Sequence, residues 1–271
     1  MSKLLIRTLS GLTFAFLSVL LLSYNQITAT LYLYALMMLC LREFQNLRNY
    51  RSLWSFVTAS LIFYNVGLSF WVDMPFLDNS KSIAAYALGA SLVIEMIFVL
   101  LSKLKMKAFI NISLNLFYIV LPYCLALGLG YIAQDFTAFS STILISVFVL
   151  LWSNDSFAFL IGKNIGKTPL APKISPNKTI EGFIGGLIST VITAIGISFF
   201  YPEISVFNWI ILALIVSIFG VLGDLLESYF KRKAGVKDSA NAIPGHGGFL
   251  DRLDSFILAA PFTYLFLTYI F

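Results

Sequence analysis

The chain has 271 residues, of which 59% are hydrophobic and only 11% are charged, and its mean hydropathy is +0.89. Soluble globular domains carry about 25% charged residues, so this composition excludes a water-soluble protein and indicates a polytopic membrane protein. Because a spanning helix satisfies its own backbone hydrogen bonds inside lipid, the predicted fold class is all-α, and the net charge of +5 matters through its placement.

A spanning helix needs roughly 20 apolar residues, and nine segments come near that length. In chain order they are residues 4–23, 27–41, 52–72, 82–101, 110–132, 137–161, 179–201, 206–227 and 255–271. Lys3 and Arg7 precede the first segment, but no small-residue cleavage pattern follows it, so we expect a retained helix and not a signal peptide. The boundary around Asn25 is uncharged, which predicts a tight hairpin between the first two helices.

The basic residues sort strongly between the two sets of connections. If the N-terminus is cytoplasmic, seventeen of the eighteen lysines and arginines fall on the inside and only Lys81 falls outside. By the positive-inside rule this predicts about nine helices, with the N-terminus cytoplasmic and the C-terminus outside. The two longest polar connections, residues 162–178 and 228–254, then share the cytoplasmic face. We divide the chain into residues 1–136, helices 1–5 for scaffold and lipid access, and residues 137–271, helices 6–9 with the catalytic motifs.

Polar residues gather in residues 223–255, which hold five of the thirteen acidic residues, five of the eighteen basic ones and the only histidine. The basic block of residues 231–233 and Lys237 either orients the eighth helix against anionic lipid or binds phosphate, and both interpretations stay open. Residues 244–248 contain three glycines in four positions, which lets backbone N–H groups approach an anion closely. His246 fits a general base, a metal ligand or a loop organiser, and its glycine neighbours favour the organiser.

Four of the five carboxylates of this stretch come in two helical pairs. Asp224, Glu227 and Ser228 share one face at the end of the eighth helix, and Asp251 and Asp254 lie three apart at the entry of the ninth. Carboxylates from two helices suit Mg²⁺, which prefers carboxylate oxygens together with waters and substrate phosphates. Taken singly, each acid is explained by pairing with a nearby lysine or arginine. As a set at the membrane edge, they indicate function.

Three further features lie outside that stretch. Ser175 as N-cap and Pro176 at the first helical position predict a helix start, with Lys178 in its first turn as part of an anion site. Asp155 places a carboxylate at the cytoplasmic end of the sixth helix. Glu95 lies inside the fourth helix, where protonation, pairing across helices and proximity to the site all remain open. Together with the carboxylates, these groups predict a site where a polyphosphate reacts with a molecule of the bilayer.

Three segments carry a family resemblance. Residues 228–254 follow the pattern S-x-F-K-R, four residues, K-D, and then P-G-H-G-G-x-x-D-R-x-D throughout, and so resemble the phosphatidate cytidylyltransferase (CDP-diacylglycerol synthase) family. Residues 175–182 resemble that family's S-P-x-K-T-x-E-G, and residues 155–167 resemble its D-x-x-A-Y-x-x-G-x-x-x-G-K. Phe159 stands where the family often has Tyr, and Asn177 where Lys is frequent. Both departures fall on candidate substrate contacts.

The resemblance, which begins near Trp152, implies a reaction and a metal. CTP and phosphatidic acid would give CDP-diacylglycerol and pyrophosphate on a dimeric multi-helix membrane protein that requires Mg²⁺. It also implies Asp224 and Asp251 as the metal carboxylates, with Asp254 and Asp155 as further candidates, and a second, monovalent cation is a further candidate.

The phosphatidate phosphate is already an anion at neutral pH, so it can attack the α-phosphorus of CTP without a strong general base. Catalysis is then expected to consist of positioning and charge neutralisation. The residues assigned to catalysis are Asp224, Asp251, Lys178, Lys231, Arg232, Lys237, Asp238, His246 and Arg252. Those assigned to substrate binding are Ser175, Asn177, Lys178, Thr179, Lys231, Arg232, Gly247 and Gly248.

Two other functions compete with this one. A CTP-dependent polyprenol or phytol kinase would release CDP and a phospholipid, and a cation or phosphate transporter would move its substrate without nucleotide chemistry. The expected partners are CTP, phosphatidic acid, membrane lipids and a second copy of the chain, with no nucleic acid. The expected location is a bacterial inner membrane.

Overall fold

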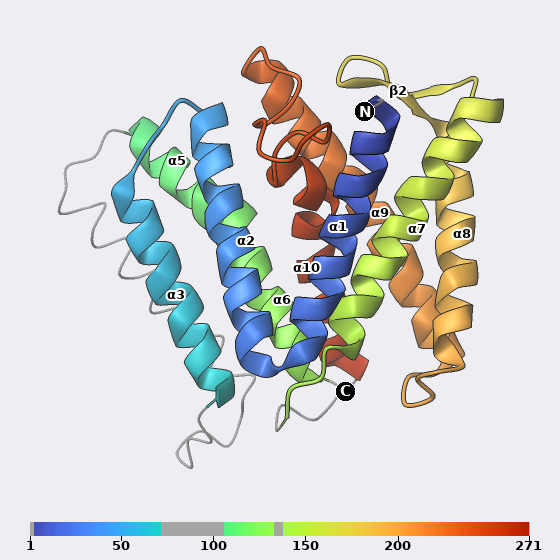
Figure 1. Ribbon diagram of the computed structural model, residues 1–271, viewed down its shortest axis with the longest axis horizontal. Helices are drawn as coiled ribbons and strands as arrows, with labels where there is room; N and C mark the ends of the chain where they lie inside the picture. The colour runs from blue at the N-terminus through green and yellow to red at the C-terminus, as the bar shows by residue number, and fades with distance from the viewer. Residues whose placement is uncertain (1–2, 72–105, 133–137, 271) are drawn as a thin grey trace. The chain divides into compact units, whose positions relative to one another are not determined.

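The computed structural model describes residues 3–71, 106–132 and 138–270, and almost all of its regular structure is helical (Figure 1). Six of the described helices are long and apolar enough to cross a membrane. They are Gln26–Leu47, Ile110–Ile132, Thr142–Ile165, Ile180–Ser198, Val206–Lys233 and Leu250–Ile270. The predicted all-α polytopic membrane protein is confirmed. The helix predicted at residues 82–101 lies outside the described residues, and the count of nine and the orientation of the termini stay predictions.

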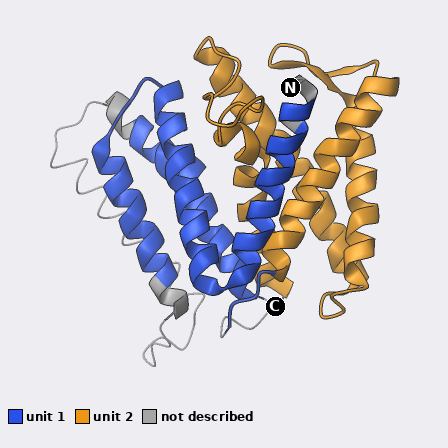
Figure 2. Cartoon of the chain, in the orientation of Figure 1, with its two compact units in different colours: residues 1–141, 271 blue, residues 142–270 orange. Residues whose placement is uncertain are grey.

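The chain divides into two compact units, residues 1–141 and 142–270 (Figure 2). Our sequence-based boundary, between residues 136 and 137, falls five residues before this division.

In the first unit, α1 (Lys3–Tyr24) and α2 (Gln26–Leu47) form the predicted tight hairpin. The Asn25 side chain accepts a hydrogen bond from the Thr28 N–H at 2.8 Å, and the Thr28 hydroxyl accepts one from the Asn25 N–H at 3.2 Å. This reciprocal cap satisfies backbone donors that a helix start would otherwise leave without partners. The single residue between the helices is therefore sufficient to turn the chain.

Helix α2 extends six residues beyond the predicted end at residue 41, to Leu47. The extension is stable because its polar side chains find partners: the Gln45 side-chain oxygen accepts from the Ser52 N–H at 2.9 Å. Ser52 precedes α3 (Leu53–Trp71), so Gln45 also fixes the turn between the two helices. The predicted helix ended at residue 41 because hydropathy detects only the apolar part of α2.

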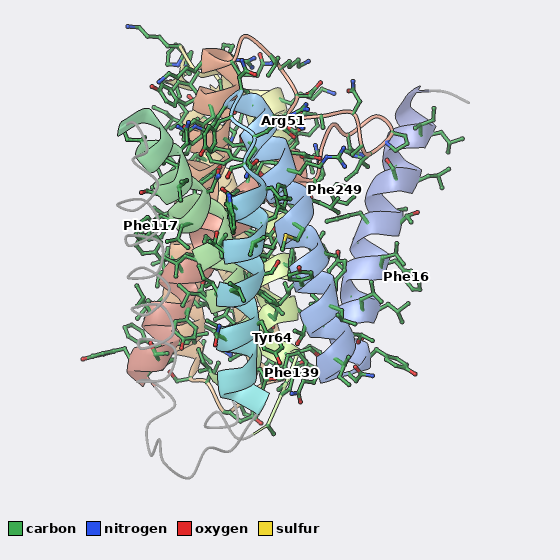
Figure 3. All side chains as sticks on the ribbon, turned by 90° about the vertical axis from the view of Figure 1, so that its left-hand side faces the viewer. Phe16, Arg51, Tyr64, Phe117, Phe139 and Phe249 are labelled. Atoms are coloured by element: carbon green, nitrogen blue, oxygen red, sulfur yellow. The ribbon has the colours of Figure 1, made fainter. Side chains whose placement is uncertain are left out.

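Within the described part of this unit, the remaining helix consists of α5 (Met106–Asn115), a π-helical turn η1 (Leu116–Val120) and α6 (Leu121–Ile132). Its buried face packs on α2, where the Cys40 thiol and the Tyr123 hydroxyl lie 3.2 Å apart. Large apolar side chains of the unit point outward, among them Phe16, Tyr64 and Phe117 (Figure 3), which are more than half exposed. An exposed apolar surface of this kind suits lipid contact.

The second unit contains four long helices and a small hairpin. These are α7 (Thr142–Ile165), β1 (Pro169–Ala171), β2 (Ser175–Thr179), α8 (Ile180–Ser198), α9 (Val206–Lys233) and α10 (Leu250–Ile270). The two strands pair antiparallel, and the hairpin links the end of α7 to the start of α8. The hairpin and the connection between α9 and α10 lie at the same end of the unit (Figure 1).

Glycines set the close packing of α8 on α7. A Cβ atom at Gly186 would lie 2.9 Å from the Asn154 carbonyl oxygen, and one at Gly182 would lie 2.7 Å from the Ala158 carbonyl oxygen. Both distances are shorter than ordinary van der Waals contact, so only glycine fits, as expected for a small-residue helix face. Gly223 plays the same part between α9 and α10, where a Cβ atom would collide with the Asp254 carbonyl oxygen.

A buried amide joins three of these helices. Asn154 of α7 is 1% exposed, and its side-chain oxygen accepts from the Ser217 hydroxyl of α9 at 2.7 Å. The Thr190 hydroxyl of α8 lies 3.5 Å from the same oxygen. Since a buried polar group costs free energy unless it is hydrogen-bonded, these contacts select one register of α7, α8 and α9.

The structure corrects the predicted helix start at Ser175. Residues 175–179 form strand β2, and the N-cap of α8 is Thr179, whose hydroxyl accepts from the Gly182 N–H at 3.1 Å. Pro176 has no N–H to donate, which a two-stranded hairpin tolerates. Lys178 therefore lies just before the helix and not in its first turn.

Two helix ends also differ from the predicted ones. Helix α9 continues from residue 227 to Lys233, and α10 begins at Leu250, five residues earlier than expected. The additional turn of α9 ends in three basic residues, which suits the negative end of the helix dipole. Asp251 falls in the first turn of α10, where the dipole favours a carboxylate.

Candidate active site

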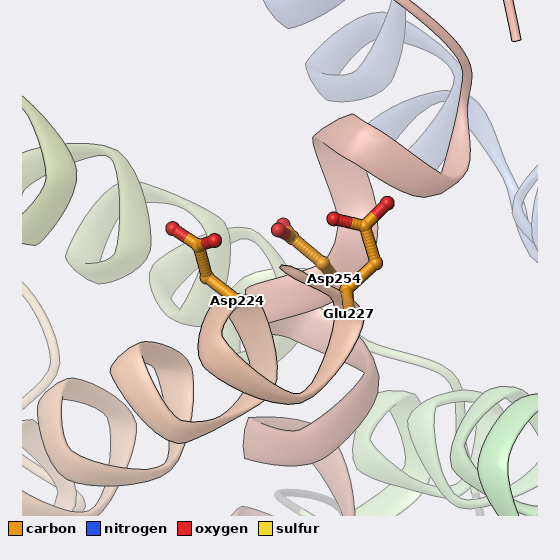
Figure 4. A group of neighbouring side chains, drawn as sticks. All are labelled: Asp224, Glu227 and Asp254. Atoms are coloured by element: carbon orange, nitrogen blue, oxygen red, sulfur yellow. The ribbon is translucent and has the colours of Figure 1, made fainter. Parts of the chain in front are cut away.

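Three carboxylates come together between α9 and α10 (Figure 4). Asp224, Glu227 and Asp254 each offer an oxygen, and these oxygens lie within 4.8 Å of one another. Glu227 is fully buried, Asp254 is 8% exposed and Asp224 is half-buried. We call these three residues the carboxylate group.

Lysines from two directions neutralise the carboxylate group. Lys178 of the hairpin forms an ion pair with Asp224, and Lys231, one turn after Glu227 on α9, forms an ion pair with Glu227. Although Glu227 has this ion pair, neither of its oxygens accepts a hydrogen bond of good geometry within the described part of the chain. Lys231 therefore neutralises the charge of Glu227 but leaves acceptor capacity on its oxygens, which a bound divalent cation would use.

The Lys178–Asp224 pair also tests a topological prediction. Lys178 belongs to the connection between α7 and α8, and Asp224 to the end of α9. A second contact joins the same regions, because the Arg232 Nε donates to the Ile174 carbonyl oxygen at 3.3 Å. The two polar connections therefore meet, as the positive-inside pattern predicted.

Asp251 lies in a different network. Its Oδ1 accepts from the Lys231 Nζ at 2.7 Å, and its Oδ2 accepts from the Gly248 N–H at 2.7 Å. The N–H and hydroxyl of Ser239, both 2.9 Å from Oδ2, complete the set. In this structure Asp251 fastens the connection between α9 and α10 to both helices, and it is not part of the carboxylate group. Its assignment as a metal ligand stays a prediction.

The glycine run is folded around Asp251. Gly245 and Gly247 have φ angles of 75° and 86°, in the left-handed region that glycine adopts most readily. A Cβ atom at Gly247 would collide with the Asp251 carboxylate. The Gly248 N–H, which the sequence placed near a substrate anion, is donated to the chain's own carboxylate. The glycines thus allow a tight turn and close packing, and substrate contact by Gly247 and Gly248 stays a prediction.

Glu181 has a role that sequence reasoning missed. Its carboxylate accepts from the N–H groups of Lys167 and Thr168 at 3.0 and 3.1 Å and from the Thr168 hydroxyl at 2.9 Å. These contacts close the base of the hairpin that carries Lys178. The sequence did mark Glu181, which is the glutamate of the S-P-x-K-T-x-E-G pattern. Hydrophobicity and charge alone, however, could not predict which groups it binds.

We expect Glu181→Ala to loosen this hairpin without unfolding the helices. Loss of these hydrogen bonds weakens the closure of the hairpin, and solvent screening at this exposed position keeps the effect local. Limited proteolysis should then cut the region of residues 166–179 faster than in the unaltered protein. Glu203→Ala, which removes an exposed acid from the opposite end of α8, is the control. Equal cleavage rates in the two variants would contradict the assignment.

The other predicted residues belong to α7, the hairpin, the end of α9, the connection between α9 and α10, and the start of α10. Those that are exposed or partly exposed are Asp155, Ser175, Asn177, Lys237, Asp238, His246 and Arg252. Asp155 is within electrostatic range of Lys178 and Asp224. Thr179 caps α8, and Arg232 binds the hairpin, so both act within the chain in this structure. Glu95 lies outside the described residues.

The donor set fits a hard divalent cation. Three carboxylate oxygens from two helices, one of them partly open to solvent, can supply part of the oxygen shell that Mg²⁺ prefers and leave positions for water or phosphate. The sequence proposed Asp224 and Asp254 among four candidates but did not single out Glu227. Its position three residues after Asp224 on the same helix face was the available signal.

Comparison with known proteins gives a consistent result. The sequence model of the cytidylyltransferase family matches residues 5–270. Proteins named phosphatidate cytidylyltransferase from Staphylococcus haemolyticus, Staphylococcus aureus (strain COL) and Bacillus subtilis (strain 168) are 42%, 46% and 48% identical over 178, 147 and 120 residues. These stretches cover 62%, 51% and 44% of this chain and 65%, 56% and 45% of the relatives. The chain thus matches less than two thirds of each relative's length. Because the family model spans nearly the whole sequence, this protein belongs to the cytidylyltransferase family.

Proposed function

We propose that this protein joins CTP and phosphatidic acid to give CDP-diacylglycerol and pyrophosphate. The observation that carries the proposal is the meeting of an acidic group and basic side chains at one end of the second unit. The names of the relatives support the choice of substrates. So does the apolar surface of the helices, which would keep a lipid substrate close to the site.

In this proposal the carboxylate group holds Mg²⁺. Asp224, Glu227 and Asp254 supply oxygens, and the ion, when bound, would stabilise the charge that develops on the leaving pyrophosphate. Asp251, the other family-implied ligand, would reach the ion only after release of its hydrogen bonds to Ser239 and Gly248.

The remaining chemistry belongs to the side chains and the substrates. The main obstacle is to bring two polyanions together, so basic residues must offset charge and fix geometry. Lys178 contacts the carboxylate group through Asp224, and Lys178, Lys237 and Arg252 are exposed or half-exposed, which suits them to binding phosphate oxygens. An oxygen of the phosphatidate phosphate then forms a bond to the α-phosphorus as the bond to pyrophosphate breaks. No residue needs to remove a proton.

The membrane arrangement is part of the proposal. We infer nine spanning helices with a cytoplasmic N-terminus, the polar end of the second unit facing the cytoplasm, and a homodimer in a bacterial inner membrane. The charge sorting of the connections supports the helix count and the orientation. The dimer follows from the family resemblance, and the location is supported by the bacterial relatives.

Product identification tests the function. Purified protein in detergent is incubated with radiolabelled CTP and phosphatidic acid, with and without Mg²⁺, and the labelled products are separated. We expect a CDP-lipid and pyrophosphate only when Mg²⁺ is present. Formation of CDP and a phosphorylated lipid alcohol would instead indicate a kinase, and the absence of any nucleotide product would refute the proposal.

A further inference from the structure

Two lysines bind the acidic residues of this site in different ways. Lys178 and Asp224 keep 27% and 30% of their side-chain surfaces exposed. The Lys231 side chain is 11% exposed, and its partners Glu227 and Asp251 are 0% and 6% exposed. One pair is therefore open to solvent and the other is enclosed.

We propose that Lys178 is an exchangeable counter-ion, which holds Asp224 in the resting protein and leaves it when a divalent cation binds. Lys231 is by contrast a permanent counter-ion that stays between Glu227 and Asp251. This inference rests on the proposed function only through the cation site. It adds a residue that links occupation of that site to the binding of substrate phosphate.

The number of contacts supports exchange at Lys178. Among the described residues, the Nζ of Lys178 forms an ion pair with Asp224 alone, whereas the Nζ of Lys231 is held by two carboxylates from two helices. Moving Lys231 would leave two buried carboxylates without a counter-charge, which is strongly unfavourable. Moving Lys178 exposes Asp224 to water or to a cation at small cost, because ion pairs that are open to solvent contribute little to stability.

Electrostatics favours exchange of the lysine that is open to solvent. The Lys178 ammonium occupies an oxygen of Asp224, and a divalent cation at the carboxylate group needs the same carboxylate. Two positive centres a few ångströms apart repel each other strongly where the surroundings are partly desolvated. Lysine has a flexible four-carbon stem, so its ammonium can move several ångströms while the hairpin stays in place. Asp155, within electrostatic range, offers a second carboxylate on the way.

The exchange couples two binding events. When a cation displaces Lys178 from Asp224, the Lys178 ammonium lies at the edge of the site. There it can bind a phosphate of the nucleotide. Phosphate bound to Lys178 in turn keeps Asp224 available to the cation. By linkage each ligand then strengthens the other by the same factor.

The first test measures cation binding without nucleotide. Mn²⁺ serves as the probe for Mg²⁺, and free Mn²⁺ is measured by electron paramagnetic resonance in the presence of the purified full-length protein. We expect Lys178→Met to bind Mn²⁺ several-fold more tightly than the unaltered protein, because the competing ammonium is gone. Lys178→Arg and Lys173→Met should bind as the unaltered protein does; the latter removes an exposed lysine from the same hairpin loop. Equal or weaker binding by Lys178→Met would overturn the inference.

The second test needs no substitution. Lysines of the unaltered protein are acylated with a small amine-directed reagent with and without saturating Mg²⁺, and labelling is read by mass spectrometry. Labelling of Lys178 should rise several-fold with Mg²⁺, while that of Lys173 stays constant and that of Lys231 stays low. If the protein binds Mn²⁺ but the labelling of Lys178 does not change, the exchange of Lys178 is refuted and the proposed cation site is not. A protein that binds no Mn²⁺ in any variant would overturn the proposed cation site, and the exchange with it.

Discussion

Asp224→Asn is expected to lower the rate of CDP-lipid formation by roughly 100-fold or more, the scale of losing one preorganised charge at a phosphoryl-transfer centre. The substitution keeps the shape of the side chain but removes the charge that pairs with Lys178 and contributes to the carboxylate group. The measurement is the initial rate of product formation at a series of Mg²⁺ concentrations. Glu203→Gln, an isosteric change at an exposed acid of the same unit, is the control and should keep the full rate.

The Mg²⁺ series separates two roles for the acids. If Asp224 is a ligand, high Mg²⁺ should recover part of the lost rate of Asp224→Asn, since weakened affinity can be offset by concentration. Asp251→Asn should not recover in this way if Asp251 mainly fastens the connection between α9 and α10. Near-normal turnover of Asp224→Asn at limiting Mg²⁺ would remove Asp224 from the cation site. Recovery of both variants by Mg²⁺ would return Asp251 to the set of ligands.

Lys231→Met is expected to cost about 3 kcal/mol or more of unfolding free energy, because it leaves Glu227 and Asp251 buried without their shared counter-charge. The relevant measurement is reversible denaturation of the purified protein in detergent, followed by helix content. From the sequence, Lys231 is expected to bind substrate phosphate. That role predicts a different outcome for Lys231→Met, namely lost activity with unchanged stability.

Two matched variants make this result interpretable. Lys233→Met removes an exposed lysine from the same turn of α9 and should leave stability nearly unchanged. The double variant Lys231→Met with Glu227→Gln should be more stable than Lys231→Met alone, since one of the two orphaned charges is gone. If Lys233→Met and Lys231→Met had the same unfolding free energy, the ion pairs of Lys231 with Glu227 and Asp251 would not contribute to stability.

The sequence predicted the helical class and the meeting of the polar connections for a clear reason. Hydropathy and charge sorting are one-dimensional signals that a bilayer imposes directly on a chain. The same signals fail at helix ends. Helix α9 continues through Lys231 because a lysine one turn after Glu227 satisfies that carboxylate, and hydropathy contains no term for such a pair.

Within the site, residue types were easier to predict than partners. The sequence identified Asp224 and Lys178 as functional candidates, but their direct ion pair depends on a hairpin that was expected to be a helix start. Glu227 and Asp251 show the same limit. Their places on two helices were predictable, but Asp251 faces the glycine run because Ser239 and Gly248 donate to it, and only the folded connection brings those donors together.

The contact between Arg232 and Ile174 has a consequence for variation among related proteins. Its acceptor is a main-chain carbonyl, which every amino acid possesses. The side chain of residue 174 can therefore vary while Arg232 still binds the hairpin between α7 and α8. In an alignment of related proteins, we expect a constant arginine at position 232 and different residues at position 174. Statistical searches for residues that mutate together would overlook this tether, although Arg232→Met should release it.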